Sequence, residues 1–218
     1  MPVISDAVAN AAREYKVVRV HSGPLRGRSE SVSLAIGAVR RAVQHGSSSL
    51  VMVSGAPGSG KTTLARHLAE ALDVPWLSRD TFSRGIRRTE GTMPPSNRSW
   101  SVWYGTLAHL LGHSVSLVMD QTMYRGMAEA DISLHLLRLC RPRLIHCHAP
   151  DALQRFKARE RAQHGESSSE YQRVLGLALE AQPTTLEPPD LGVALLRVDT
   201  SDGYHPSVDE MLEFILRS

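Results

Sequence analysis

Eight consecutive residues in the first third of the chain have the types and the order needed to hold a phosphate group. Residues 55–62 read Gly-Ala-Pro-Gly-Ser-Gly-Lys-Thr, follow the apolar run 50–53 and open a helical pattern over 61–72. Glycines let successive backbone N–H groups curl around a phosphate, and a helix N-terminus adds partial positive charge. The spacing G-x-x-x-x-G-K-[ST] between a strand and a helix predicts a P-loop that binds a nucleoside triphosphate.

The lysine and the threonine of this loop have different expected tasks. Lys61 is predicted to reach the β- and γ-phosphates of ATP, and the Thr62 hydroxyl is predicted to ligate Mg²⁺. A chance glycine turn before a helix is the alternative, and the adjacent Lys-Thr pair argues against it. The residues expected to contact the nucleotide are Gly55, Ala56, Pro57, Gly58, Ser59, Gly60, Lys61, Thr62 and Thr63.

Two aspartates follow predicted strands, at the sheet edge where open α/β sheets bind their ligands. Asp120 ends the apolar run 115–119 and is predicted to hold Mg²⁺ directly or through water, with helix capping as the alternative. Asp80 follows the run 74–77 and is predicted to orient an acceptor hydroxyl and accept its proton. Its alternatives are a role linked to Mg²⁺ and a cap on the helix that follows.

Two arginines on the helix predicted after the fourth strand form a candidate lid. Arg155 and Arg159 are one helical turn apart, and Asp151 lies one turn before Arg155. Arginines that close over a γ-phosphate stabilise the charge that develops in phosphoryl transfer, so both are predicted to be catalytic. The alternative is an ordinary solvated helix face.

These residues need a scaffold, and the rest of the sequence predicts one. Short apolar runs alternate with helical patterns from residue 50 onward, which is typical of βαβ units in a parallel sheet. The predicted strands are 50–53, 74–77, 115–119, 144–148 and 193–198, and the predicted helices are 61–72, 99–111, 127–139, 152–163, 169–179 and 207–216. The expected fold class is α/β, a five-stranded parallel sheet with helices on both faces, as in P-loop NTPases of the kinase type.

The chain is expected to divide near its first glycine-serine cluster. Residues 1–46 are predicted to be an N-terminal helical extension, whose helical pattern at 30–45 is expected to pack on the main domain. Residues 47–218 are predicted to form the nucleotide-binding domain.

Composition limits the function classes. The 218 residues include 42% hydrophobic and 22% charged residues, which is typical of a globular protein with one α/β core. A net charge of +3 does not predict a nucleic-acid-binding arm. Cys140, His146, Cys147 and His148 lack the spacing of a zinc site. Two cysteines and no apolar run of membrane-spanning length favour a cytoplasmic protein with no membrane partner.

Five segments together resemble one family of P-loop kinases. They are GAPGSGKTTLARHLAEAL, LSRDTF, SLVMDQT, IHCHAPDALQRFKARERAQH and RVDTSD. The family includes chloramphenicol phosphotransferase, zeta toxins and the kinase domain of phage polynucleotide kinase, and the resemblance covers about residues 48–218. It implies that Asp80 is the base, that Arg155 and Arg159 are lid arginines, and that the loop containing Thr200 passes the adenine.

The acceptor region departs from these relatives. Zeta toxins follow their aspartate with a phenylalanine, an arginine and a His-Pro pair, which this chain lacks, so the resemblance to kinases of UDP-sugars is weakened. The pair Arg79-Asp80 is more similar to polynucleotide kinase. The segment 84–104 has no close counterpart, and Trp103 is expected in the core while Trp100 is expected to line a pocket. The candidate acceptor-binding residues are Arg79, Arg84, Trp100 and Tyr104.

The sequence therefore predicts an ATP- and Mg²⁺-dependent phosphotransferase that moves the γ-phosphoryl group to a hydroxyl of a small molecule. One alternative is a polynucleotide or nucleoside 5′-hydroxyl kinase, for which nucleic acid would be the less favoured acceptor. Another is a nucleotide-binding regulator with slow ATPase activity. A kinase needs Asp80 and the lid arginines, whereas a regulator needs neither.

Overall fold

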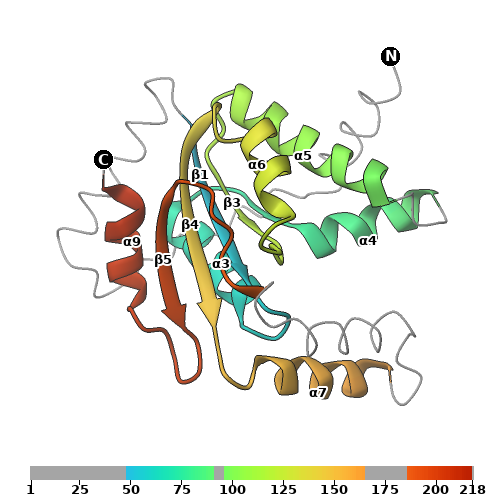
Figure 1. The fold of residues 1–218 in the computed structure, drawn as a ribbon, viewed down its shortest axis with the longest axis vertical. Coiled ribbons are helices and arrows are strands. Elements are labelled where there is room, and N and C mark those ends of the chain that lie inside the picture. Colours follow the sequence, from blue (N-terminus) through green and yellow to red (C-terminus); the bar gives the residue numbers. More distant parts are fainter. Residues whose placement is uncertain (1–47, 91–95, 165–185, 218) are drawn as a thin grey trace.

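In the computed structural model, which describes residues 48–90, 96–164 and 186–217, the core is a parallel β-sheet (Figure 1). The strands are β1 (Ser48–Gly55), β2 (Trp76–Ser78), β3 (Leu117–Asp120), β4 (Cys140–His148) and β5 (Ala194–Asp199). Their order across the sheet is β2-β3-β1-β4-β5, and each neighbouring pair is parallel. The predicted five-stranded parallel sheet is therefore confirmed.

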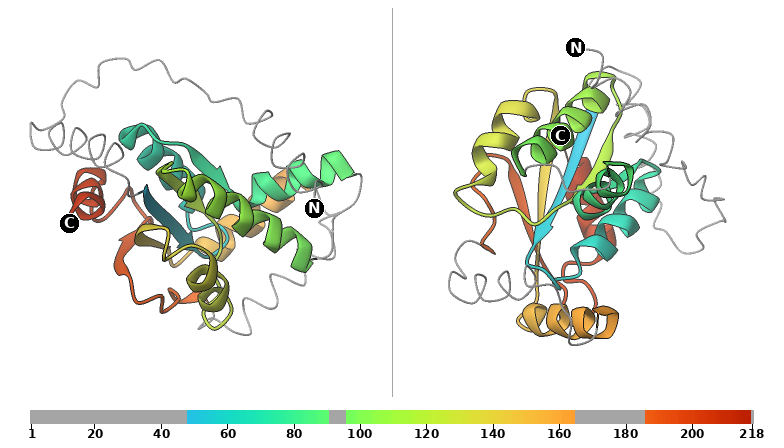
Figure 2. Two further views of the ribbon diagram at one scale, coloured as in Figure 1. Left: turned by 90° about the horizontal axis from the view of Figure 1, so that it is seen from above. Right: turned by 90° about the vertical axis from the view of Figure 1, so that its right-hand side faces the viewer.

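Helices cover both faces of the sheet (Figure 2). The helices are α3 (Lys61–Leu72), α4 (Arg79–Glu90), α5 (Ser96–Gly112), α6 (Ala128–His135), α7 (Ala152–His164) and α9 (Val208–Leu216). α3 and α9 share a core with Val51 and Val53 of β1, whereas α5 and α6 share a core with Leu50 and Met52 of the same strand. Alternate side chains of a strand face opposite sides, so β1 is buried on both.

α7 differs from the other helices because it lies across the carboxyl ends of the strands (Figure 1). This is the edge at which the P-loop joins β1 to α3. A ligand held by the P-loop therefore lies on the same edge as α7.

The glycine-rich turn before α3 and a left-handed residue after it set the limits of this helix. Gly60 precedes the helix with φ 78°, and Asp73 follows it with φ 57°. Leu64, Leu68 and Leu72 recur at helical spacing and are buried against the sheet. The observed bounds of α3 equal the predicted range 61–72.

Two strand starts lie later in the chain than predicted. Val74 donates its N–H to Ala69, and Val115 donates its N–H to Leu110, so both valines finish the turn that ends a helix. β2 and β3 therefore begin at Trp76 and Leu117 rather than at residues 74 and 115. Apolar residues in a helix-ending turn cannot be distinguished from strand residues by pattern alone.

Three further elements show the largest differences from the prediction. β4 begins at Cys140 instead of 144, because it pairs with β1 from Ser48 onward despite its polar first residues. α6 ends at His135 instead of 139. α4 was not predicted as a separate helix, since the segment 79–90 has few apolar residues.

The predicted helix 169–179 and the predicted extension 1–46 lie outside the described residues, and the domain boundary at 46/47 stays a prediction. In the described parts of the chain, no helix combines the length and the apolar character needed to cross a membrane.

Candidate active site

The P-loop is built so that only glycine fits at two of its positions. Gly55 has φ 143°, and a Cβ there would lie 2.4 Å from the carbonyl oxygen of Cys147. Gly58 has φ 86°, and a Cβ there would lie 1.9 Å from the carbonyl oxygen of Ala152, the first residue of α7. Positive φ and absent side chains let backbone amides surround a phosphate. The loop geometry fits a nucleotide.

Lys61 is the buried charge of this loop. The residue is only 8% exposed, and its Nζ lies 3.5 Å from the Ala56 carbonyl oxygen, across the loop. Burial lowers the pKa of Lys61, while the negative charges of Asp80 and Asp120 oppose that shift. The positive charge of Arg159 adds to it. The charges of three groups predicted from the sequence, Asp80, Asp120 and Arg159, therefore act on Lys61.

Asp120 faces α3 from the end of β3. Its Oδ2 accepts a hydrogen bond from Thr62 Oγ1 at 2.9 Å, and the carboxylate is 1% exposed. Burial raises the pKa of Asp120, and the hydrogen bonds from Trp76 and Thr62 oppose this shift. Hydroxyl and carboxylate oxygens are ligands that Mg²⁺ prefers, so the pair Thr62 and Asp120 fits the predicted metal site.

Asp80 lies on the same edge but in different surroundings. It is the second residue of α4 and is exposed to solvent. The helix begins at Arg79, so Asp80 lies within α4 and is not its N-cap residue. Its negative charge acts on Lys61 and Asp120. The predicted role of Asp80 as the base stays a prediction.

The two arginines of α7 have different contacts. Arg155 donates Nε to Asp151 Oδ2 at 2.8 Å, and its two terminal nitrogens donate to the carbonyl oxygens of Thr200 and Ser201 at 3.1 and 2.9 Å. Arg159 has a side chain that is 55% exposed, and its Nε lies 3.9 Å from Glu160 Oε1. Arg155 therefore joins α7 to the loop after β5, whereas Arg159 projects from the helix near the P-loop.

Thr200 links the same loop to the P-loop. Its hydroxyl lies 2.8 Å from the Ser59 carbonyl oxygen and 3.1 Å from the His148 carbonyl oxygen. The side chain predicted to lie beside the adenine is thus hydrogen-bonded to protein carbonyl groups. Its contact with a nucleotide stays a prediction.

The candidate acceptor region joins α4 to α5 through Arg79. The guanidinium carbon lies 4.2 Å from the centre of the Trp100 ring, Nη2 donates to Ser99 Oγ at 2.7 Å, and Nη1 donates to Ser83 Oγ. Trp100 in turn stacks on Tyr104 with ring centres 5.7 Å apart and planes at 19°. Arg79 is buried, and its contacts join α4 to α5.

The other aromatic residues of α5 extend this stack and enter the core. Tyr104 is 2% exposed and stacks on His135 of α6 at 6.0 Å. Its hydroxyl accepts a hydrogen bond from Gln121 Nε2, while Gln121 Oε1 accepts one from Trp103 Nε1. Burial raises the pKa of Tyr104 to about 12. Trp103 lies in the core, as predicted.

Trp100 and Arg84 complete the set of predicted acceptor residues. Trp100 is half-buried, and its ring already contacts Arg79 and Tyr104. Arg84 is exposed on α4, where its Nη2 lies 3.3 Å from Thr81 Oγ1. Acceptor contact by these residues stays a prediction.

Three side chains near the site were not singled out from the sequence. Trp76 donates its indole N–H to Asp120 Oδ1 at 2.6 Å, Ser78 Oγ lies 3.4 Å from Asp120 Oδ2, and Gln121 joins Trp103 to Tyr104. Trp76 and Ser78 alternate along β2, so the sequence pattern places them on one face of that strand. Knowing that this face meets Asp120 requires the strand order β2-β3, which the sequence does not provide.

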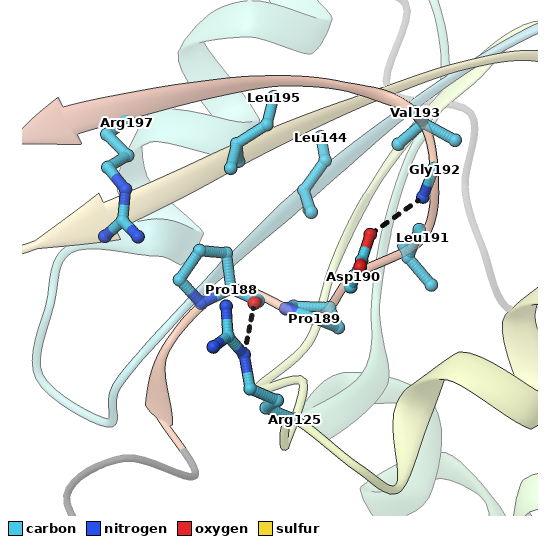
Figure 3. A pocket seen from close by; sticks show the side chains of 10 residues that line it. All are labelled: Arg125, Leu144, Pro188, Pro189, Asp190, Leu191, Gly192, Val193, Leu195 and Arg197. Carbon is cyan, nitrogen blue, oxygen red and sulfur yellow. Dashed lines mark hydrogen bonds between the residues drawn. The ribbon is translucent and has the colours of Figure 1, made fainter.

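A separate cavity of about 290 Å³ lies over β4 and β5 (Figure 3). Leu144 and Leu195 lie on the strand side of this cavity, and the segment 188–193 crosses over it. Arg125 reaches the cavity from the loop after β3 and donates Nε to the Pro188 carbonyl oxygen at 3.0 Å. The lining includes none of the predicted site residues, so this cavity is distinct from the P-loop region.

The strand order, the P-loop and the carboxylate at the end of β3 together define the class of the protein, which is that of the P-loop nucleotide-binding folds. Residues 50–189 match the family model described as an AAA domain (AAA_33), which is more than half of the chain. The chain belongs to this family. No curated protein sequence matches it.

Several solved structures are similar to the chain, and the first of them shares its fold. A proposed kinase from Chloroflexus aurantiacus j-10-fl is 24% identical with a TM-score of 0.62, and the match covers 78% of this chain and 97% of that one. A gluconokinase from Sinorhizobium meliloti 1021 is 19% identical with a TM-score of 0.49, over 78% and 91% of the two chains. A shikimate kinase from Acinetobacter baumannii, in complex with shikimate, is 19% identical with a TM-score of 0.44, over the same shares.

Proposed function

We propose that the chain is an ATP- and Mg²⁺-dependent phosphotransferase that moves the γ-phosphoryl group to a hydroxyl of a small molecule. The observation that carries the proposal is the P-loop with its buried Lys61, which lies beside the hydrogen-bonded pair Thr62 and Asp120. Asp80, Asp120 and Arg159 come from three different elements, and the charge of each acts on Lys61. A phosphoryl-transfer site requires cations at the phosphates and a carboxylate for the acceptor.

Each of these residues has a task in the proposed reaction. The P-loop amides and Lys61 hold the β- and γ-phosphates of ATP. Asp80 orients the acceptor hydroxyl and accepts its proton as the oxygen attacks phosphorus. Arg159 stabilises the negative charge on the transferring oxygens, and ADP leaves on the opposite side. Thr62 and Asp120 would hold Mg²⁺, which would supply positive charge to the phosphates.

Two features support a kinase over a regulator with slow ATPase activity. Asp80 is exposed at the sheet edge where an acceptor would approach. It lies inside α4 and is not the N-cap residue of that helix. Arg159 projects from α7 with more than half of its side chain exposed. A regulator that only binds nucleotide needs neither group, whereas a transferase uses both.

The test is a screen of acceptors with the intact protein. ATP and Mg²⁺ are supplied together with alcohols, sugars, nucleosides or 5′-hydroxyl oligonucleotides, and ADP release and phosphorylated product are both measured. The expected result is product from a small hydroxyl compound, and at least about 10²-fold less product with Lys61→Ala. Product from oligonucleotides alone would favour the polynucleotide kinase alternative, and ADP release without any phosphorylated acceptor would favour the regulator.

A further inference from the structure

The carboxylate of Asp120 is held by more donors than the P-loop alone supplies. Oδ1 accepts the indole N–H of Trp76 at 2.6 Å, which is a short and charge-assisted hydrogen bond. Oδ2 accepts from Thr62 at 2.9 Å, and Ser78 Oγ lies at 3.4 Å from the same oxygen. Each carboxylate oxygen therefore has its own principal donor.

This division fixes how the carboxylate is turned. A carboxylate rotates easily about its last torsion, because that torsion has a broad energy profile. The indole N–H holds Oδ1 on the β2 side, which leaves Oδ2 directed toward the Thr62 hydroxyl. Thr62 and Asp120 are the two residues assigned to Mg²⁺, so the orientation of the metal site depends on Trp76.

A second residue acts on the indole itself. The guanidinium carbon of Arg66 lies 5.6 Å from the centre of the Trp76 ring, a distance typical of a cation–π contact. A cation over the ring draws electron density from it and makes the N–H a stronger donor. Arg66 is one helical turn after Thr62 on α3, so the same helix carries the metal ligand and the cation.

We propose that Trp76 is a positioning residue for the metal site: its indole N–H orients Asp120 toward Thr62, and Arg66 strengthens that hydrogen bond. The inference rests on the proposed function, because it takes Asp120 as the carboxylate that holds Mg²⁺. It assigns a task to two residues that lie outside the P-loop. Trp76 also packs beside the apolar core on the α3 face, so the experiment must separate the N–H from the ring.

The experiment measures metal affinity without relying on turnover. ADP binding is followed by calorimetry at increasing Mg²⁺ concentration and also in EDTA, for the wild-type protein and for a protein in which Trp76 is replaced by β-(3-benzothienyl)alanine. This amino acid keeps the two-ring shape and replaces the N–H by sulfur. The half-saturating Mg²⁺ concentration is expected to rise about tenfold, since partners that orient metal ligands typically contribute at least this factor. ADP affinity in EDTA is expected to stay unchanged.

Variants of Arg66 provide the second measurement, because this exposed residue can be changed with little effect on folding. Arg66→Gln is expected to raise the half-saturating Mg²⁺ concentration about two- to threefold, and Arg66→Lys is expected to raise it less. Thermal unfolding in EDTA shows that each protein is folded. Trp76→Phe, which also removes the second ring, is expected to match the benzothienyl protein in Mg²⁺ dependence but to unfold at a lower temperature.

The outcomes separate this inference from the proposed function. If the benzothienyl protein and the wild type need the same Mg²⁺ concentration, Trp76 is a packing residue and the inference is wrong, while the phosphotransferase proposal stands. If ADP binding by the wild type does not respond to Mg²⁺, the metal assignment of Thr62 and Asp120 is wrong, and the inference fails with it.

Discussion

Two carboxylates lie at the ends of the neighbouring strands β2 and β3, and their surroundings suit them to different tasks. Asp120 is buried and accepts hydrogen bonds from Trp76 and Thr62, so its lone pairs are already directed. Asp80 is exposed in the first turn of α4, where an incoming hydroxyl can reach it. A base needs access to its proton, whereas a metal-site carboxylate needs a fixed orientation. This difference supports Asp80 as the base.

Asp80→Asn is expected to lower kcat by about 10²-fold, because an amide cannot accept the hydroxyl proton. ATP affinity is expected to change little, since Asp80 lies beside the phosphate site rather than in it. Steady-state kinetics on the acceptor found by the screen, together with calorimetry, measure both quantities.

The matched control is Asp209→Asn, which changes an exposed aspartate in the first turn of another helix, α9. It is expected to leave kcat and ATP affinity unchanged. Loss of Mg²⁺-dependent ATP binding in a folded Asp80→Asn protein would assign Asp80 to the metal site instead.

Gly58→Ala is expected to reduce ATP affinity at least tenfold and to lower the free energy of unfolding. The left-handed backbone alone costs about 1–2 kcal/mol for a residue with a Cβ. The new Cβ would also meet the Ala152 carbonyl oxygen at 1.9 Å and force α7 away from the P-loop.

Gly126→Ala is the control, because Gly126 has a similar φ of 84° and open space around it. The control should unfold more easily by the backbone cost only, and equal unfolding free energies for the two variants would show that the contact with α7 is unimportant.

At the scale of elements, α7 is attached to the rest of the site at its first turns. Ala152 touches Gly58, and Arg155 bonds to the loop after β5. Arg159, one turn further along, makes a longer contact with Glu160 and remains more than half exposed. The helix therefore has a fixed base and a segment that can reach the phosphates.

Arg159→Ala is expected to lower kcat about 10²-fold with little change in ATP affinity, because its contact strengthens as charge moves onto the transferring oxygens. Arg159→Lys should recover part of the rate, since an ammonium keeps the charge but loses the two-point contact. Arg155→Ala is expected to affect ATP affinity and thermal stability more than kcat, because it releases α7 from the loop at Thr200. Kinetics and calorimetry on each variant give the two quantities.

The control for this helix is Arg161→Ala, whose side chain is exposed. The neighbouring Glu160 is buried and is therefore unsuitable as a control. Wild-type kcat in the Arg159→Ala protein would show that this part of α7 is an ordinary solvated face, and the regulator alternative would then be favoured.

The elements show which parts of the structure a single sequence can predict. The P-loop, α3 and the strands β1 and β5 depend on local patterns such as glycine spacing and apolar runs, and these were predicted closely. The role of Trp76 depends on β2 lying beside β3, and the stack of Arg79 and Trp100 depends on the crossing of α4 and α5. Such contacts are set by tertiary packing, so the local pattern contains no signal for them.

At the scale of the whole molecule, one buried histidine links stability to pH. His146 on β4 is 5% exposed, and its Nδ1 has no hydrogen-bond partner among the described residues. Burial lowers the pKa of His146 from 6.5 to about 4, and the charges of Arg197, His148 and Arg125 act in the same direction while Glu187 opposes them. At a pH between about 4 and 6.5, the unfolded chain therefore binds more protons at His146 than the folded chain does.

The protein is expected to lose stability as the pH falls from 7 to 5, because the unfolded state gains a proton on His146 that the folded state excludes. A folded pKa of about 4 corresponds to a loss of about 2 kcal/mol over this interval. His146→Leu should remove this part of the pH dependence, whereas His113→Gln, at an exposed position, should keep it. Urea unfolding at pH 5 and pH 7 measures the difference, and an equal pH dependence in the wild type and His146→Leu would contradict the prediction.

The end of β3 limits how the acceptor preference of the proposed phosphotransferase could be redesigned. Asp120 faces α3, while the next residue, Gln121, bonds to Trp103 and Tyr104 of α5 on the opposite face. One peptide bond thus joins the residue that contacts the P-loop helix α3 to the residue that contacts the aromatic side chains of α5. A designer who replaces α5 to admit another acceptor must therefore keep partners for the Gln121 amide, or the new helix will shift Asp120 as well. Variants with altered acceptor choice should be selected at limiting Mg²⁺, where such a shift is most costly.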